Sequence, residues 1–209
     1  GDEIDAVAAV EEDIAEEAKR LAGQGVVELN LIGQDSSYYG MDQYGKLRLP
    51  DLLERLNRVA GVRWIRILYA HPAHVTPEMI AAIRDLPKVT KYLDIPLQHA
   101  SDRLLAAMRR ETDGFSIRRL VETLRRDVPG IALRTTFIVG FPGETEEEVE
   151  TLAQFMREAR FERVGIFPYS SEPKTPAERM PDQIPQPVKQ ERLDRLMRLQ
   201  QGISEELTQ

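Results

Sequence analysis

Five short clusters of polar side chains follow apolar stretches of this sequence, and their residue types could bind a metal or an organic ligand. Histidine and aspartate are common zinc ligands, whereas glutamine, serine and threonine donate and accept hydrogen bonds. Taken singly, each cluster is typical of an ordinary turn, in which Ser101 and Thr145 would cap helices. The clusters are GQDSS (33–37), AHPAH (70–74), QHAS (98–101), GFPGET (140–145) and YSSEPKT (169–175).

The histidines are the basis of one interpretation, a metal hydrolase built on a barrel. His71, His74 and His99 each follow a predicted strand. Asp35 and Asp94 could add carboxylate ligands to zinc. However, the HPAH motif contains a proline and does not lie on one helical face, and the chain has only three histidines. We therefore expect no metal-binding residues in this chain and keep the hydrolase as an alternative.

The apolar stretches that lead into the clusters predict strands, and amphipathic stretches between them predict helices. Thr76 with Pro77, and Thr145 with Glu148, are typical of helix starts. The alternation indicates an α/β fold with a parallel sheet, either doubly wound or curved into a barrel, and places the clusters at its ligand-binding edge. The strands are predicted at VVELNLIG (26–33), WIRILYA (64–70), YLDIPL (92–97), IALRTTFIVG (131–140) and RVGIFPY (163–169).

Composition limits the class of protein. A chain of 209 residues, 42% of them hydrophobic, can bury one core and predicts a single domain over residues 1–209. No apolar run is long enough to span a bilayer, so we expect a cytoplasmic protein. The formal net charge of −7 argues against a nucleic-acid-binding surface and favours a basic protein partner.

Four long motifs, in order along the chain, carry a resemblance to a known family. They are LNLIGQDSSYYG (29–40), YLDIPLQHASDRLLAAMRR (92–110), LRTTFIVGFPGETEEEVE (133–150) and FPYSSEPKTPA (167–177). In these motifs the sequence resembles the radical S-adenosylmethionine (SAM) core of the methylthiotransferases, and specifically the RimO type. The MiaB type, which acts on a tRNA adenosine, typically has GQN and LQSGS where this chain has GQD and LQHAS.

The resemblance implies a fold, an activity and partners. The fold would be a partial parallel (βα) barrel of the radical SAM type, without the first strand and the cluster loop. The complete enzyme would use a 4Fe–4S cluster to reduce S-adenosylmethionine to a 5′-deoxyadenosyl radical, and would add a methylthio group to an aspartate of a small-subunit ribosomal protein. An electron donor protein would be a further partner, whereas this domain would bind neither membrane nor nucleic acid.

The resemblance also implies where the cofactor lies, although it identifies no catalytic residue. Gln34 would contact the methionine amine, and Arg134 would pair with the methionine carboxylate. Glu144 is assigned instead to a helix terminus. The ribose and amino-acid portion would be near Gln98 and Ser101, and the adenine would be near the remaining residues. The expected cofactor-binding residues are Gln34, Gln98, Ser101, Arg134, Ile138, Gly140, Phe167 and Tyr169.

The chain departs from this family in one respect, because it contains no cysteine. The family holds its 4Fe–4S cluster with three cysteines in a C-x3-C-x2-C motif, which would precede a segment like residues 1–25. We therefore expect a core-domain fragment without the family's amino-terminal and carboxy-terminal domains, inactive without its cluster cysteines. Two alternatives stay open: a MiaB-type tRNA adenosine methylthiotransferase, and a cluster-free barrel module that binds a protein.

Overall fold

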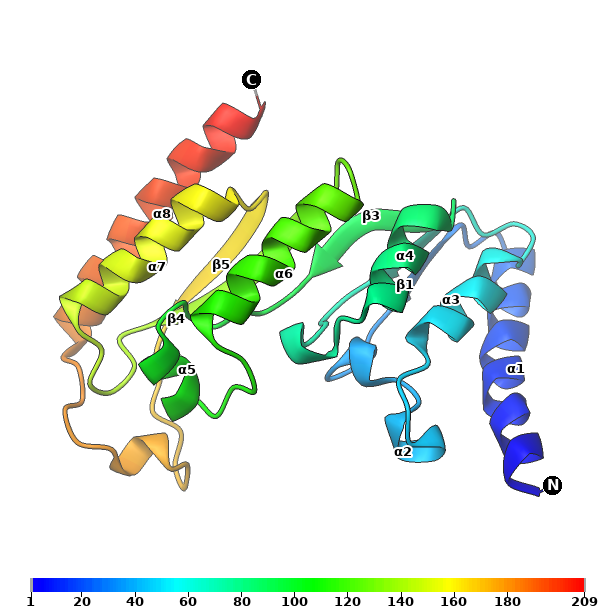
Figure 1. Cartoon of the computed structure of the whole chain (residues 1–209), viewed down its shortest axis with the longest axis horizontal. Coiled ribbons are helices and arrows are strands. Elements are labelled where there is room, and N and C mark those ends of the chain that lie inside the picture. Colours follow the sequence, from blue (N-terminus) through cyan, green and yellow to red (C-terminus); the bar gives the residue numbers. More distant parts are fainter. Residues whose placement is uncertain (1, 209) are drawn as a thin grey trace. The chain divides into compact units, whose positions relative to one another are not determined.

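The computed structural model describes residues 2–208, which divide into two compact units. The first unit comprises the described residues up to Asp94 together with Leu124–Ile131. The second unit comprises Ile95–Thr123 and the described residues from Ala132 onward. Figure 1 labels the helices and strands of both units.

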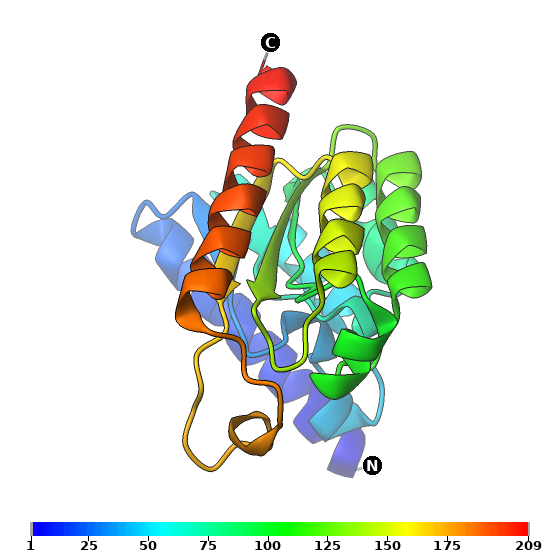
Figure 2. The same ribbon diagram turned by 90° about the vertical axis from the view of Figure 1, so that its left-hand side faces the viewer.

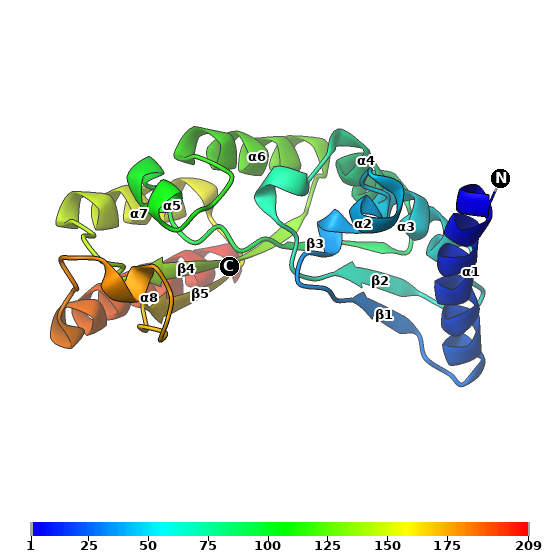
Figure 3. The same ribbon diagram turned by 90° about the horizontal axis from the view of Figure 1, so that it is seen from below.

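Three parallel strands form the sheet of the first unit, in which β2 pairs with β1 on one side and with β3 on the other. Ile65 and Ile67 of β2 are fully buried, whereas Trp64, on the other face of the strand, is half exposed. Helices α3 and α4 cover the buried face, as Figure 3 shows. The elements of this unit are α1 (Asp2–Gly23), β1 (Glu28–Leu31), α2 (Met41–Tyr44), α3 (Leu49–Asn57), β2 (Trp64–Ile67), α4 (Pro77–Asp85) and β3 (Val89–Asp94).

The second unit contains two further strands, which pair in parallel. Their register runs from Arg134 opposite Arg163 to Val139 opposite Pro168. Phe137, Phe155 and Phe161 pack edge to face at centroid distances of 5.6–6.3 Å and form its aromatic core. Helix α6 begins in this unit and ends in the first. The elements are α5 (Asp102–Ala107), α6 (Gly114–Asp127), β4 (Ala132–Val139), α7 (Glu146–Ala159), β5 (Arg163–Pro168) and α8 (Gln186–Thr208).

The predicted alternation of strands and helices, with parallel pairing, is confirmed. Thr76 caps α4 by accepting the N–H of Met79, and Thr145 with Glu148 forms the predicted capping box of α7. The strand predicted at 92–97 ends earlier, because β3 stops at Asp94 and Pro96 offers no N–H for a ladder. Within residues 2–208, no helix combines the length and the apolar character needed to cross a membrane.

Helix α8 packs against β5, β4 and α7 with an unusually polar buried face (Figure 2). Its buried positions recur every three or four residues, as expected for one face of a helix. Two of them are apolar and three are polar. The buried residues are Lys189, Arg192, Leu196, Gln200 and Ile203. A buried polar group needs a hydrogen-bond partner, so the backbone and side chains beneath α8 must supply several.

Candidate functional site

A cavity of about 320 Å³ lies in the second unit, at the carboxyl ends of β4 and β5. Its walls are mostly apolar, with a few polar and charged side chains among them. This composition is typical of sites for small organic ligands. The lining residues are Gln98, Ala107, Met108, Arg109, Arg110, Ile138, Phe141, Tyr169, Thr175, Pro176, Ala177 and Met180.

Gln98 is held at this cavity by an unusual backbone conformation. Its φ is 71°, a left-handed value that is uncommon for a residue other than glycine. Two backbone hydrogen bonds fix it beside β4: its N–H donates to Thr136 O and its carbonyl accepts the N–H of Ile138, both at 2.8 Å. The side-chain oxygen Oε1 is buried and has no hydrogen-bond partner among the described residues. An unsatisfied buried acceptor of this kind is expected where a ligand donates.

Tyr169 contributes a second unsatisfied oxygen to the same cavity. Its N–H donates to Val139 O at 2.7 Å, and its ring meets Phe141 edge to face at 5.2 Å between centroids. Lys189 of α8 donates from Nζ to Tyr169 O at 2.8 Å and lies 4.9 Å from the ring centroid. The phenol oxygen is buried without a partner among the described residues. Tyr169 and Gln98 therefore both line the cavity and each has a side-chain oxygen that can still form a hydrogen bond.

Buried charged groups pack against the turn that follows β4. Glu144 Oε1 accepts the N–H of Gly140 and a bond from Arg192 Nη1, both at 2.8 Å. His99 Nδ1 accepts the N–H of Ser101, so its hydrogen is on Nε2, which lies 3.4 Å from Glu144 Oε2. The sequence analysis assigned Glu144 to a helix end, but its carboxylate points inward and its side chain is fully buried.

Ser101 and Glu148 join the start of α5 to the start of α7. The Ser101 hydroxyl donates to Glu148 Oε1 at 2.7 Å and, as predicted, caps α5. Arg103 reaches the same carboxylate from Nε and Nη2. Burial alone would raise the pKa of Glu148, but the bonds from Arg103, the Thr145 N–H and Ser101 outweigh it and lower the pKa to about 2. Glu148 is therefore ionised at neutral pH, and its hydrogen bonds connect the start of α5 to the start of α7.

Of the other predicted cofactor-binding residues, some lie at this cavity and others do not. Ile138 lines the cavity, and Gly140 forms the turn beside it. Arg134 is exposed and lies on β4 four residues before Ile138, which is two strand repeats, so it is on the same face and about 13 Å away along the strand. Phe167 is 57% exposed and does not line the cavity. Gln34 belongs to the first unit, where it is exposed in the turn after β1.

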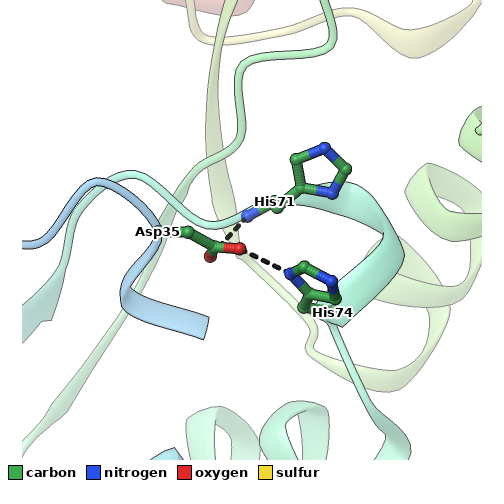
Figure 4. A group of neighbouring side chains, drawn as sticks. All are labelled: Asp35, His71 and His74. Carbon is green, nitrogen blue, oxygen red and sulfur yellow. Dashed lines mark hydrogen bonds and ion pairs between the residues drawn. The ribbon is translucent and has the colours of Figure 1, made fainter. Parts of the chain in front are cut away.

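The first unit holds a separate cluster of Asp35, His71 and His74, shown in Figure 4. Asp35 follows β1, and the histidines occupy a short 3-10 turn after β2. Burial alone would raise the pKa of Asp35, but bonds from Ser37, His74 and the His71 N–H outweigh it and hold the pKa below its usual value. The group of possible metal ligands does not include His99, which belongs to the second unit.

Several residues of these sites were missed by the sequence analysis. Phe141 and Met180 line the cavity of the second unit, and Lys189 and Arg192 reach the site from α8. The spacing of the buried positions on α8 was a usable signal, because it identifies an inward face that contains charged residues. The cavity wall from Thr175 to Met180 gave no such signal, since it consists of turns and one short 3-10 helix, Ala177–Arg179.

Comparisons with known proteins agree on one family. The family described as the radical SAM superfamily matches residues 2–156. Proteins named ribosomal protein uS12 methylthiotransferase RimO are similar: that of Heliobacterium modesticaldum is 52% identical over 194 residues, and that of an Anaeromyxobacter species is 54% identical over 193. These alignments cover 93% and 92% of this chain but only 42% and 41% of the relatives, so the chain spans less than half of their length.

Solved structures show the same fold. Coproporphyrinogen III oxidase (HemN) of Escherichia coli, described as a radical SAM enzyme, aligns with a TM-score of 0.67 and 21% identity over 95% of this chain and 46% of its own. Methylornithine synthase (PylB) aligns with a TM-score of 0.54 and 18% identity over 90% of this chain and 53% of its own. The predicted α/β fold of the radical SAM type is thereby confirmed.

Proposed function

Because this chain belongs to the radical SAM superfamily, we propose that it is the core of an enzyme that adds a methylthio group to an aspartate of ribosomal protein uS12. The main support is identity of about half over nearly the whole chain with proteins named for that activity. The GQD and LQHAS motifs, which distinguish the RimO type from the MiaB type, point the same way. Because the proposed substrate belongs to the ribosome, we also propose that this activity is cytoplasmic.

The cavity of the second unit fits the nucleoside end of S-adenosylmethionine. Its volume of about 320 Å³ is within the usual range for small-molecule sites, about 300–1,000 Å³. Ile138 and Phe141 offer apolar surface for a purine ring, and the unpaired oxygens of Gln98 and Tyr169 can bond to its amino group or to ribose hydroxyls. When bound, this cofactor would supply the radical that removes hydrogen from the target carbon, whereas a second S-adenosylmethionine would supply the methyl group of the product.

Arg134 is the residue of β4 that we assign to the methionine carboxylate. It shares the exposed face of the strand with Ile138 and lies about 13 Å before it, a separation that an extended S-adenosylmethionine can bridge. Its guanidinium can bind a carboxylate with two parallel hydrogen bonds. We further propose that Ser101, Gly140, Phe167 and Gln34 border this ligand, in the roles given by the family resemblance.

The residues of this chain do not fit a 4Fe–4S cluster. Such clusters are held by cysteine thiolates, and the sequence contains none. We propose that the cluster ligands come from a part of the enzyme outside residues 1–209. The roles that remain for this chain are to bind the nucleoside, to orient the carboxylate and to exclude water from the reaction.

The substrate assignment is tested in a bacterium whose own uS12 methylthiotransferase gene has been deleted. Expression of the full-length protein that contains this chain is expected to restore the methylthio group on one aspartate of uS12, as measured by mass spectrometry of the isolated ribosomal protein. Methylthioadenosine in tRNA hydrolysates of cells that lack MiaB would instead favour the MiaB type. A folded protein that modifies neither molecule would favour a cluster-free binding module.

We expect Arg134→Ala in the full-length enzyme to raise the dissociation constant for S-adenosylmethionine by about tenfold or more, because a charge-assisted bidentate pair is lost. Isothermal titration calorimetry measures the change. Arg63→Ala removes the same charge from an exposed position before β2 and is expected to leave binding unchanged. Equal affinities for the Arg134→Ala variant and the unmodified enzyme would remove Arg134 from the cofactor site.

A further inference from the structure

The cluster of Asp35, His71 and His74 in the first unit has the composition and spacing of a metal site. Each residue offers one ligand atom, and the three atoms lie within 4.8 Å of one another. We propose that the three side chains bind a divalent first-row transition-metal ion, for which Zn²⁺ is the probe. None of the three residues lines the cavity assigned to S-adenosylmethionine, which lies in the second unit.

The distances require only small movements of the side chains. Bonds from zinc to nitrogen and oxygen are about 2.0–2.2 Å, so two ligand atoms of one ion lie at most about 4.2 Å apart. His74 Nδ1 and Asp35 Oδ2 are 2.5 Å apart, and the rings of His71 and His74 are 5.0 Å apart between centroids. In a tetrahedral site the ligand atoms lie about 3.4 Å apart, so the most widely spaced of the three atoms must approach one another by about 1–1.5 Å, which rotation of the side chains can supply.

The carboxylate of Asp35 is oriented by hydrogen bonds, as metal-binding carboxylates commonly are. One oxygen, Oδ1, accepts the N–H of Ser37 at 3.0 Å, the Ser37 hydroxyl, and the N–H of His71 at 3.1 Å. The other oxygen, Oδ2, is thereby directed towards His74. The ligand oxygen is thus positioned by groups that do not themselves bind the ion.

The HPAH motif positions both histidines through the backbone. His71 precedes a 3-10 turn that starts at Pro72, and its carbonyl accepts the N–H of His74 at 2.9 Å. His71 Nδ1 also accepts the N–H of Ala73 at 3.2 Å, which orients the ring. The sequence analysis counted against this motif that it does not lie on one face of an α-helix. A 3-10 turn has three residues per turn, which brings positions 71 and 74 onto the same side.

The ligand set determines which ions fit. Two imidazoles and one carboxylate suit Zn²⁺, Fe²⁺, Co²⁺ and Ni²⁺, whereas Mg²⁺ and Ca²⁺ prefer sites made of oxygen ligands. Three ligands leave at least one coordination position open. The side chains of His74 and Asp35 are 22% and 20% exposed, so an ion can reach them from solvent. An ion bound here would join the turn after β1 to the turn after β2.

Titration of the purified chain with Zn²⁺ tests the site, with metal content measured after dialysis. The absence of cysteine simplifies the result, because no thiolate of the chain competes for zinc. We expect one Zn²⁺ per chain, a dissociation constant below about 10 μM, and a higher unfolding temperature when zinc is present. His74→Ala, His71→Ala and Asp35→Asn are each expected to weaken binding by about tenfold or more.

Asp42→Asn is the matched control for Asp35→Asn, because it removes a carboxylate from α2 in the same unit, outside the cluster. This control is expected to bind zinc with unchanged affinity. Circular dichroism of each variant without metal shows whether it is folded. With Co²⁺ in place of Zn²⁺, visible absorption bands reporting imidazole and carboxylate ligands are expected, and are expected to disappear in His74→Ala.

Two results would overturn the proposal. One is a dissociation constant for Zn²⁺ weaker than about 100 μM in the unmodified chain, which would mean that the three residues form only a hydrogen-bonded cluster. The other is zinc binding that persists unchanged in folded His71→Ala, His74→Ala and Asp35→Asn chains. Neither result bears on the uS12 assignment, which is measured by the modification of the ribosomal protein.

Discussion

Replacing Arg192 with methionine is expected to lower the free energy of unfolding by about 3–5 kcal/mol, the cost typical of removing one partner from a buried ion pair. Methionine keeps much of the side-chain length but leaves the fully buried Glu144 carboxylate without its cation. The N–H of Gly140 would still donate to Glu144, and His99 Nε2 would lie 3.4 Å from its other oxygen. Urea denaturation of the purified chain, followed by circular dichroism, measures the change.

Two further variants separate burial from charge in this experiment. Arg195→Met removes a partly exposed arginine on the same helix that pairs with the exposed Glu146, and is expected to cost at most about 1 kcal/mol. Adding Glu144→Gln to Arg192→Met removes the uncompensated charge, and is expected to recover at least about 1 kcal/mol of the loss. Similar losses for Arg192→Met and Arg195→Met would contradict the account of Glu144 as a carboxylate that depends on Arg192.

Gly140→Ala is expected to destabilise the chain by about 2–5 kcal/mol, because two separate costs add. Gly140 has a φ of 73°, where a side chain with a Cβ is strained by about 1–2 kcal/mol. An added Cβ would also overlap the stem of Lys189, which packs directly over the glycine. Overpacking at a buried site typically costs a further 1–3 kcal/mol or so. Urea denaturation again gives the measurement.

Gly130→Ala is the matched control for this substitution. Gly130 has a similar φ of 77°, but nothing lies within 4 Å of an added Cβ. Its replacement therefore reports the backbone strain alone, about 1–2 kcal/mol. If Gly140→Ala costs no more than Gly130→Ala, then Lys189 moves aside freely and the packing between α8 and the turn after β4 is loose.

The strands and helix starts could be predicted because their signals are local. Thr76 and Thr145 cap their helices through bonds to residues three positions later, so a short window of sequence contains both partners. The end of β3 was placed too late, because the apolar run from 92 to 97 continues past the last ladder position. Pro96 was the local signal against that extension.

The candidate site was predicted only in part, because its supporting contacts join residues far apart in sequence. Gln98, Ile138 and Tyr169 were identified and do line one cavity. Glu144, in contrast, was assigned to a helix end, since nothing near it in sequence shows that Arg192 lies against it 48 residues later. The number of free hydrogen-bonding atoms, such as Gln98 Oε1, also depends on tertiary packing and has no sequence signature.

The polar face of α8 has a consequence for when the site is completed during protein synthesis. The turn from Gly140 to Glu144 leaves the ribosome well before Lys189 and Arg192, which bond to Tyr169 O and to Glu144. Chains are made from the amino terminus at about 5–20 residues per second, so the turn waits for seconds with its carboxylate uncompensated. A nascent chain therefore acquires the supported turn beside the cavity of the second unit only after α8 has emerged and docked, however early its strands have paired.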